Sequence, residues 1–145
     1  MKKGKLIKYL NEDLAAEWGT IMRYTYQSAM AFGIRGAELR DLLQKEIPDE
    51  LGHATFLTDV IVDLGGEPVL EPKPFKLVHD IKSMLELDLK MELGDVENYK
   101  KHAHMAEEMG EIELKVKLEE MAADENRHAR ELRRILRGIE RSGAV

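Results

Sequence analysis

The second half of this chain repeats a pattern of the first half at an offset of 75 residues. Three stretches recur in the same order: Asp13-Leu14-x-x-Glu17-x-Gly19 as Asp88-Leu89-x-x-Glu92-x-Gly94, Tyr24 as Tyr99, and Asp49-Glu50-x-x-His53-Ala54 as Asp124-Glu125-x-x-His128-Ala129. In both halves, 33 residues separate the lone glutamate of the first stretch from the glutamate of the last. A single Glu-x-x-His usually belongs to a solvated helix face. Its recurrence in register with two further glutamates predicts two similar halves related by a pseudo-two-fold axis.

Apolar residues recur at helical spacing over four long segments. We expect helices over about Lys5–Phe32, Ala37–Leu64, Phe75–Met109 and Glu111–Glu140. Gly33-Ile34-Arg35-Gly36 predicts a short turn between the first two helices. Pro48 predicts a kink or an irregular turn inside the second helix, and Gly65-Gly66 predicts its end.

The extended linker Gly65–Pro74 contains Pro68, Pro72 and Pro74. Ten residues reach roughly 33 Å when extended, close to the length of a helix of about 22 residues. A tight hairpin does not need so long a connection, but a crossover along a bundle does. The sequence therefore predicts an all-α fold, a four-helix bundle of two helical hairpins joined by a long crossover, as one domain over residues 1–145.

Six side chains carry the chemistry: Glu17, Glu50, His53, Glu92, Glu125 and His128. Each histidine follows a glutamate by three residues, so both side chains project from one face of a helix. A pseudo-two-fold axis brings all six groups to the centre of the bundle. Burying four unpaired carboxylates is very costly, and two divalent cations would neutralise them. Mixed carboxylate and imidazole ligation favours iron, with manganese as the alternative.

Two aspartates are expected to support the histidines. Asp49 lies four residues before His53, and Asp124 lies four residues before His128. Metal-bound histidines usually donate their other ring N–H to a carboxylate. The symmetric arrangement is a pair of contacts across the helices, Asp49 with His128 and Asp124 with His53.

Tyr24 and Tyr99 each lie two helical turns beyond a candidate ligand. Such a tyrosine is either an ordinary aromatic of the bundle or a hydrogen-bond donor and electron source beside the metals. We take Tyr24 as the candidate for a catalytic role. His79, His102 and His104 lack the repeated motif, and we expect them at the surface.

The composition excludes several classes of protein. The absence of cysteine excludes disulfides, zinc fingers, cysteine-ligated iron–sulfur clusters and thiol nucleophiles. No apolar run approaches the length of a membrane span, and Met1-Lys2-Lys3-Gly4-Lys5 does not resemble a signal peptide, so we expect a cytoplasmic protein. A net charge of −6 argues against nucleic-acid binding.

At the residues of the repeat, the sequence resembles the ferritin-like superfamily, most closely the bacterioferritins, over roughly Leu10–Leu136. The resemblance implies that the six candidate ligands form a di-iron ferroxidase site with two iron ions per chain. It implies that Glu50 and Glu125 bridge the irons and that Tyr24 lies beside them. It also implies Fe(II), O₂ and hydrogen peroxide as reactants, storage of iron as a mineral, and assembly with further copies of the chain.

Three departures from the bacterioferritin pattern leave alternatives open. Leu51-Gly52 stands where bacterioferritins carry a haem-ligating methionine, so no haem is expected there. Only 17 residues follow His128, which favours a dimer or a smaller shell over the full cage. Arg23-Tyr24-Thr25-Tyr26 resembles rubrerythrins, in which a glutamate occupies the position of Asp95. The alternatives to a ferroxidase for iron storage, detoxification and oxidative-stress protection are a rubrerythrin-like peroxidase that reduces hydrogen peroxide and a non-enzymatic module, either a Dps-like DNA-protecting shell or a plain structural bundle.

Overall fold

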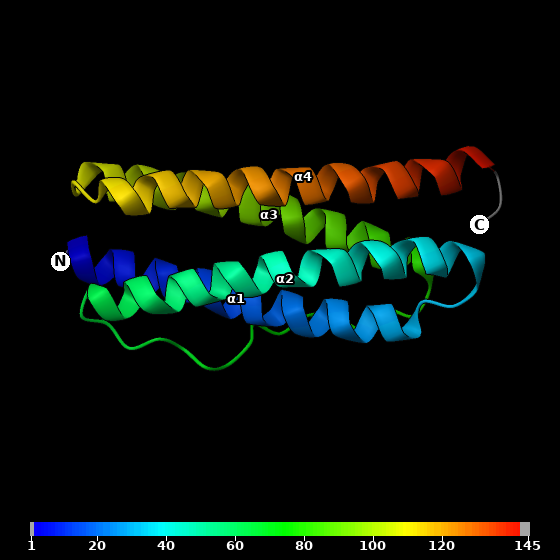
Figure 1. The fold of residues 1–145 in the computed structure, drawn as a ribbon, viewed down its shortest axis with the longest axis horizontal. Coiled ribbons are helices and arrows are strands. Elements are labelled where there is room, and N and C mark those ends of the chain that lie inside the picture. Colours follow the sequence, from blue (N-terminus) through cyan, green and yellow to red (C-terminus); the bar gives the residue numbers. More distant parts are fainter. Residues whose placement is uncertain (1, 143–145) are drawn as a thin grey trace.

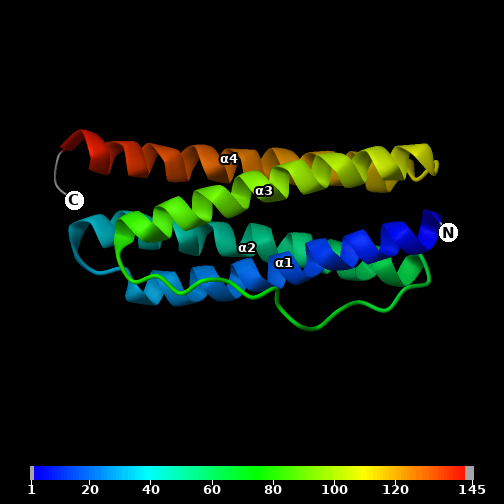
Figure 2. The ribbon, with the colours of Figure 1, turned by 180° about the vertical axis from the view of Figure 1, so that it is seen from behind.

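In the computed structural model, residues 2–142 are described, and they form α1 (Lys2–Met30), α2 (Gly33–Asp63), α3 (Ile81–Glu108) and α4 (Ile112–Ser142). No strand occurs in this part of the chain. α1 packs along α2, and α3 packs along α4, as two antiparallel hairpins that lie against each other (Figure 1). The segment between α2 and α3 runs along the outside of α1 (Figure 2). The predicted bundle of two hairpins and a long crossover is confirmed.

The chain reverses between α1 and α2 within two residues, Ala31 and Phe32. The predicted turn over residues 33–36 was wrong, because these residues form the first turn of α2. Gly33 permits this short reversal by adopting a φ of +78°, which glycine reaches without strain. Gly36 then packs on the preceding backbone: a Cβ there would lie 2.5 Å from the carbonyl carbon of Ala31.

Of two further helix ends, the end of α2 agrees with the sequence expectation and the start of α3 differs from it. α2 ends before Gly65, whose φ of +89° terminates the helix as predicted. α3 begins at Ile81 and not at Phe75, because the Asp80 side chain caps it by accepting a hydrogen bond from the Ser83 N–H at 2.9 Å. Residues 75–80 therefore belong to the crossover.

α2 continues through Pro48, so of the two features predicted there, a kink or an irregular turn, the irregular turn does not occur. Proline lacks an N–H, so the carbonyl of Gln44 loses its usual partner. Both residues lie on the exposed side of α2, where water can replace the lost hydrogen bond.

The crossover, residues 64–80, is longer than predicted and is fastened to α1. The Asn11 side chain holds its first part, since Nδ2 donates to the Glu67 carbonyl at 3.0 Å and Oδ1 accepts from the Val69 N–H at 2.9 Å. The Lys73 N–H donates to the Ala15 carbonyl of α1 at 2.8 Å. These contacts fix the path of the crossover over one face of the bundle.

The interior consists of two apolar clusters separated by a polar layer. One cluster fills the end of the bundle that holds the start of α1 and is built from residues such as Leu10, Leu57, Tyr99 and Leu118. The other fills the opposite end and includes Leu39, Leu43, Met84 and Leu132. Each helix contributes one or two of the six candidate ligands, and along each helix they lie between the residues of one cluster and those of the other. None of the helices within residues 2–142 combines the length and the apolarity that a membrane crossing requires.

We expect Gly19→Ala to destabilise the protein by about 1–3 kcal/mol, because the added methyl group overpacks a closed contact. A Cβ on Gly19 would lie 2.7 Å from the Lys73 carbonyl oxygen of the crossover. Gly94 is the repeat-equivalent position and provides the control, since no atom lies within 4 Å of a Cβ built there. Gly94→Ala should stabilise its helix by up to about 1 kcal/mol. Urea unfolding measures both, and equal effects of the two substitutions would contradict the tight packing at Gly19.

Candidate metal centre

The structure brings together all six predicted ligand residues in the polar layer. Each has at most 3% of its surface exposed. Their ligand atoms form two groups, each within 4.8 Å: Glu17, Glu50, His53 and Glu125 in the first, and Glu50, Glu92, Glu125 and His128 in the second. Glu50 and Glu125 belong to both groups. These two carboxylates therefore lie where bridging ligands would have to be.

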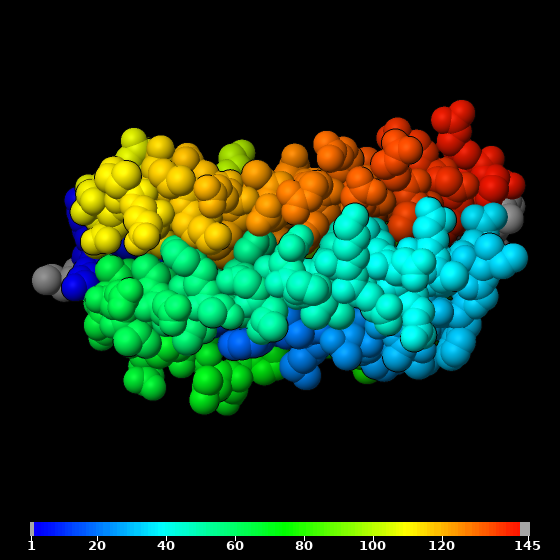
Figure 3. Space-filling view, in the orientation of Figure 1, coloured from blue at the N-terminus to red at the C-terminus, as the bar shows by residue number. Residues whose placement is uncertain are grey.

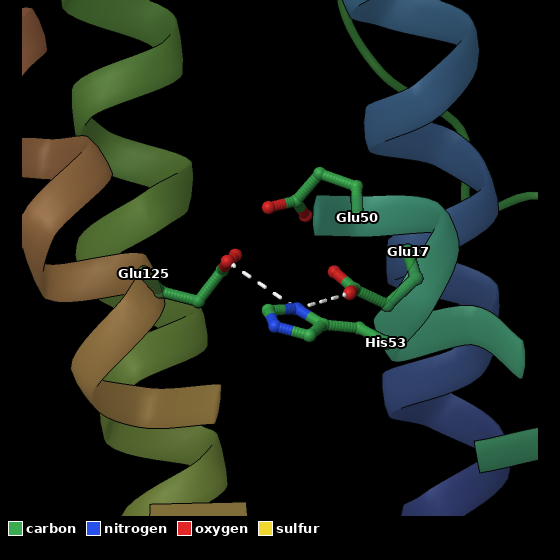
Figure 4. A group of neighbouring side chains, drawn as sticks. All are labelled: Glu17, Glu50, His53 and Glu125. Carbon is green, nitrogen blue, oxygen red and sulfur yellow. Dashed lines mark hydrogen bonds and ion pairs between the residues drawn. The ribbon is translucent and has the colours of Figure 1, made fainter. Parts of the chain in front are cut away.

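Both imidazoles direct Nδ1 toward the shared carboxylates. In the first group, His53 Nδ1 lies 2.8 Å from Glu17 Oε2 and 3.5 Å from Glu125 Oε1 (Figure 4). In the second group, His128 Nδ1 lies 3.0 Å from Glu50 Oε1 and 3.4 Å from Glu125 Oε1. The two groups thus have the same construction, as the repeat predicts.

Several carboxylate oxygens of the centre are fully buried and accept no hydrogen bond: Glu17 Oε1, both oxygens of Glu50, Glu92 Oε2 and both oxygens of Glu125. Leaving a buried charged group unsatisfied costs more than the roughly 1–3 kcal/mol of a neutral one. Two divalent cations would satisfy these oxygens and balance four carboxylates. The donor set of carboxylate and imidazole fits iron and manganese.

One carboxylate of the centre was missed in the sequence. Glu46 is 3% exposed, and its Oε2 lies 3.6 Å from His128 Nδ1. It lies one helical turn before Glu50, and this spacing was the available signal. Comparison of the two halves passes over it, because its counterpart at the offset of 75 residues is the apolar Met121.

The pKa values record how strongly these buried groups repel one another. Burial and the charge of Glu50 raise the pKa of Glu92 to about 7, and burial raises the pKa of Glu46 to about 8. Burial and the other carboxylates raise the pKa of Glu125 well above its usual value. Burial alone would lower the pKa of His128, but the Glu50 carboxylate, 3.0 Å from Nδ1, and the charge of Glu46 raise it to about 9. Without metal, protons reduce the net negative charge that cations would otherwise balance.

The outer ring nitrogens confirm the predicted contacts across the helices. His53 Nε2 lies 2.9 Å from Asp124 Oδ2, and His128 Nε2 lies 3.1 Å from Asp49 Oδ2. A proton on Nε2 that is donated to the aspartate leaves the lone pair of Nδ1 directed at the centre. An aspartate of the other hairpin thus fixes the tautomer and the orientation in which each imidazole can bind a metal.

Tyr24 lies beside the second group, and its hydroxyl donates a hydrogen bond to Glu92 Oε1. The side chain is fully buried. Tyr99 does not form the equivalent contact with a ligand carboxylate; its ring meets that of His53 edge-on, with 6.3 Å between the centroids. The two tyrosines of the repeat therefore differ in what they can do.

The expectation that His102 lies at the surface was wrong, because it is only 6% exposed. Its Nδ1 lies 2.5 Å from Asp13 Oδ2, and its ring stacks on that of Tyr9. Asp13 is itself buried on α1 and needs a partner from the neighbouring helix. His79 and His104 are exposed, as expected.

Comparison with known proteins gives consistent matches over most of the chain. A family model described as a ferritin-like domain matches residues 7–142. The bacterioferritin of Brucella melitensis is 28% identical over 125 residues, which make up 86% of this chain and 78% of that protein.

Two solved structures superpose closely on this chain. A ferritin-like, diiron-carboxylate protein from Bacillus anthracis has a TM-score of 0.91 at 39% identity, with 94% of this chain and 98% of that chain covered. The bacterioferritin of Desulfovibrio desulfuricans, whose diiron site was solved in different catalytic states, has a TM-score of 0.87 at 26% identity, covering 99% and 84%.

We expect the metal-free protein to become less stable to heat as the pH rises from about 5 to about 9. The unfolded chain releases the protons of Glu92 and Glu46 near pH 4.5, whereas the folded chain releases them near 7 and 8. Between these values the folded state holds more protons, so rising pH favours unfolding. His128 acts in the same direction, because its contribution is complete below about 6.5 and is lost as the pH rises through about 9.

Thermal unfolding followed by circular dichroism tests this expectation. Glu46→Gln removes one of these titrations and should reduce the slope of the melting temperature against pH. Glu38→Gln, at an exposed position of the same helix, should leave the slope unchanged. A melting temperature that stays level or rises between pH 5 and 9 would contradict the assignment.

Proposed function

The chain belongs to the family of ferritin-like domains, and on that premise we propose that it is a ferroxidase, which binds pairs of Fe(II) and oxidises them with O₂ or hydrogen peroxide. The observation that carries the proposal is the pair of overlapping ligand groups that share Glu50 and Glu125. Two ions held by common carboxylates can deliver two electrons to one oxidant. The match to bacterioferritins and to a diiron-carboxylate protein supports the same reading.

Each ligand has a defined part in this proposal. Glu17 and His53 would hold one Fe(II), Glu92 and His128 the other, and Glu50 and Glu125 both. Each Fe(II) gives up one electron; one O₂ takes both with two protons to form hydrogen peroxide, or one hydrogen peroxide takes both with two protons to form two waters. The apolar clusters on either side keep bulk water out. Manganese could occupy the same donors.

We assign Tyr24 the role of orienting Glu92 through its hydroxyl. The same hydrogen bond gives the phenolic proton a place to go if the ring supplies an electron. Haem has no part in the proposal, because Leu51-Gly52 offers no ligand between Glu50 and His53.

A rubrerythrin-like peroxidase is the second candidate, and Asp95 is the observation that favours it. This carboxyl lies three residues after Glu92 on α3, and burial together with the charges of Glu92 and Glu50 raises its pKa well above the usual value. A peroxidase would turn over hydrogen peroxide with an external reductant. A Dps-like shell would retard DNA.

We expect Glu125→Ala to slow rapid Fe(II) oxidation by about 100-fold or more, because it removes a ligand common to both ions. Glu50→Ala should behave in the same way, and the helical content of both variants should stay close to that of the wild type. Glu131→Ala, at an exposed position six residues farther along α4, is the matched control. Stopped-flow absorbance under air measures the rate. Wild-type kinetics in both ligand variants would remove these residues from the site.

Aerobic Fe(II) loading of the metal-free protein separates oxidation from storage. After loading, size separation and iron analysis give the number of irons per chain. Retention of about two would mark a redox enzyme that does not store mineral. Retention of many more in a large particle would mark a storage ferritin assembled from several copies. Failure to oxidise Fe(II) at all would reject the proposed activity.

A further inference from the structure

One surface side chain joins the two halves of the centre outside the ligand set. Arg127 donates from Nη1 to Asp124 Oδ1 at 3.1 Å and from Nη2 to Asp49 Oδ2 at 3.3 Å. The same two aspartates contact the outer nitrogens of His53 and His128. A continuous chain of contacts therefore runs from one imidazole to the other through a single guanidinium. It lies between α2 and α4, which run side by side on one face of the molecule (Figure 3).

The repeat does not account for Arg127. Its counterpart at the offset of 75 residues is Gly52, where no atom lies within 4 Å of an added Cβ. Both halves thus supply an aspartate, but only the second supplies the cation. Other arginines follow on the same face of α4 and have no ion pair or hydrogen bond within residues 2–142: Arg130, Arg134, Arg137 and Arg141. The engagement of Arg127 is therefore specific to its position.

We propose that Arg127 is a positioning residue, which holds both aspartates, and through them both imidazoles, in the orientation that presents Nδ1 to a metal. It couples the two metal positions from outside the ligand set. The part of this inference that concerns metal rests on the proposed function. The part that concerns the orientation of the imidazoles does not.

The aspartates need such support because they lie at the surface. The Asp49 and Asp124 side chains are 46% and 35% exposed, so water competes for their oxygens. The guanidinium presents its donors in a rigid planar fork, and one arginine can fix two carboxylates at once. Exposed ion pairs contribute little to stability, so the expected effect is on the geometry of the centre and not on folding.

The first test uses the metal-free protein and the imidazole N–H protons, observed by NMR. In the wild type, the Nε2–H protons of His53 and His128 should be protected from exchange by their aspartates. In Arg127→Ala both should exchange with water about tenfold faster or more, with the melting temperature nearly unchanged. Arg130→Ala is the matched control, one turn away on the same face, and should leave both protons as in the wild type.

The second test measures binding of Co(II) by its visible absorption. We expect Arg127→Ala to bind about tenfold more weakly at both positions. The pseudo-two-fold axis puts residue 52 in the same relation to the two aspartates, so adding Gly52→Arg to Arg127→Ala should recover most of the affinity. A general effect on the stability of α4 would not be recovered from α2.

Unchanged N–H exchange in Arg127→Ala, unchanged Co(II) affinity, or a loss that Gly52→Arg does not restore would overturn the proposal. A wild-type protein that binds no Co(II) would reject the metal function. If the N–H exchange then still depended on Arg127, its positioning role would stand.

Discussion

The burial of four carboxylates in the middle of one helical bundle is the constraint on which the rest of this structure depends. Within residues 2–142, no lysine or arginine forms an ion pair with Glu17, Glu50, Glu92 or Glu125. The folded chain accommodates them by raising the pKa values of Glu17, Glu92 and Glu125, by directing two imidazoles at the carboxylates, and by packing apolar side chains at both ends of the bundle. Two divalent cations would relieve the same repulsion. The feature that makes the metal-free bundle less stable is thus the source of its proposed affinity for metal.

The two halves agree in the ligands themselves and differ in what surrounds them. Glu46, which belongs to the first half of the chain, adds a fifth carboxylate beside the second ligand group, and its counterpart in the second half is the apolar Met121. Arg127 stands on the second hairpin, and its counterpart is Gly52. Glu46 lies close to His128, so the second position carries one more carboxylate than the first, whereas Arg127 contacts the aspartates of both histidines. Two similar ligand sets therefore need not bind or release metal alike.

Much of the centre was predictable, because it depends on spacing within single helices and on one repeat. These two facts were enough to pair Asp49 with His128 across the bundle. The start of α3 was not predictable from periodicity, since the apolar pattern extends back to Phe75 while the cap at Asp80 decides where the helix begins. The burial of His102 depends on contact between α1 and α3, and neither helix records that contact in its own pattern.

The way the ligands are shared bears on how such a chain could arise and diversify. Each proposed metal position takes three ligands from its own hairpin and one from the other, Glu125 in the first and Glu50 in the second. A two-fold dimer of one short hairpin would present the same set. The crossover, tied to α1 by Asn11, turns that encounter between two molecules into an intramolecular one at high effective concentration. In a dimer of identical hairpins, every substitution occurs twice. In one chain that holds both hairpins, a substitution in one half leaves the other half unchanged.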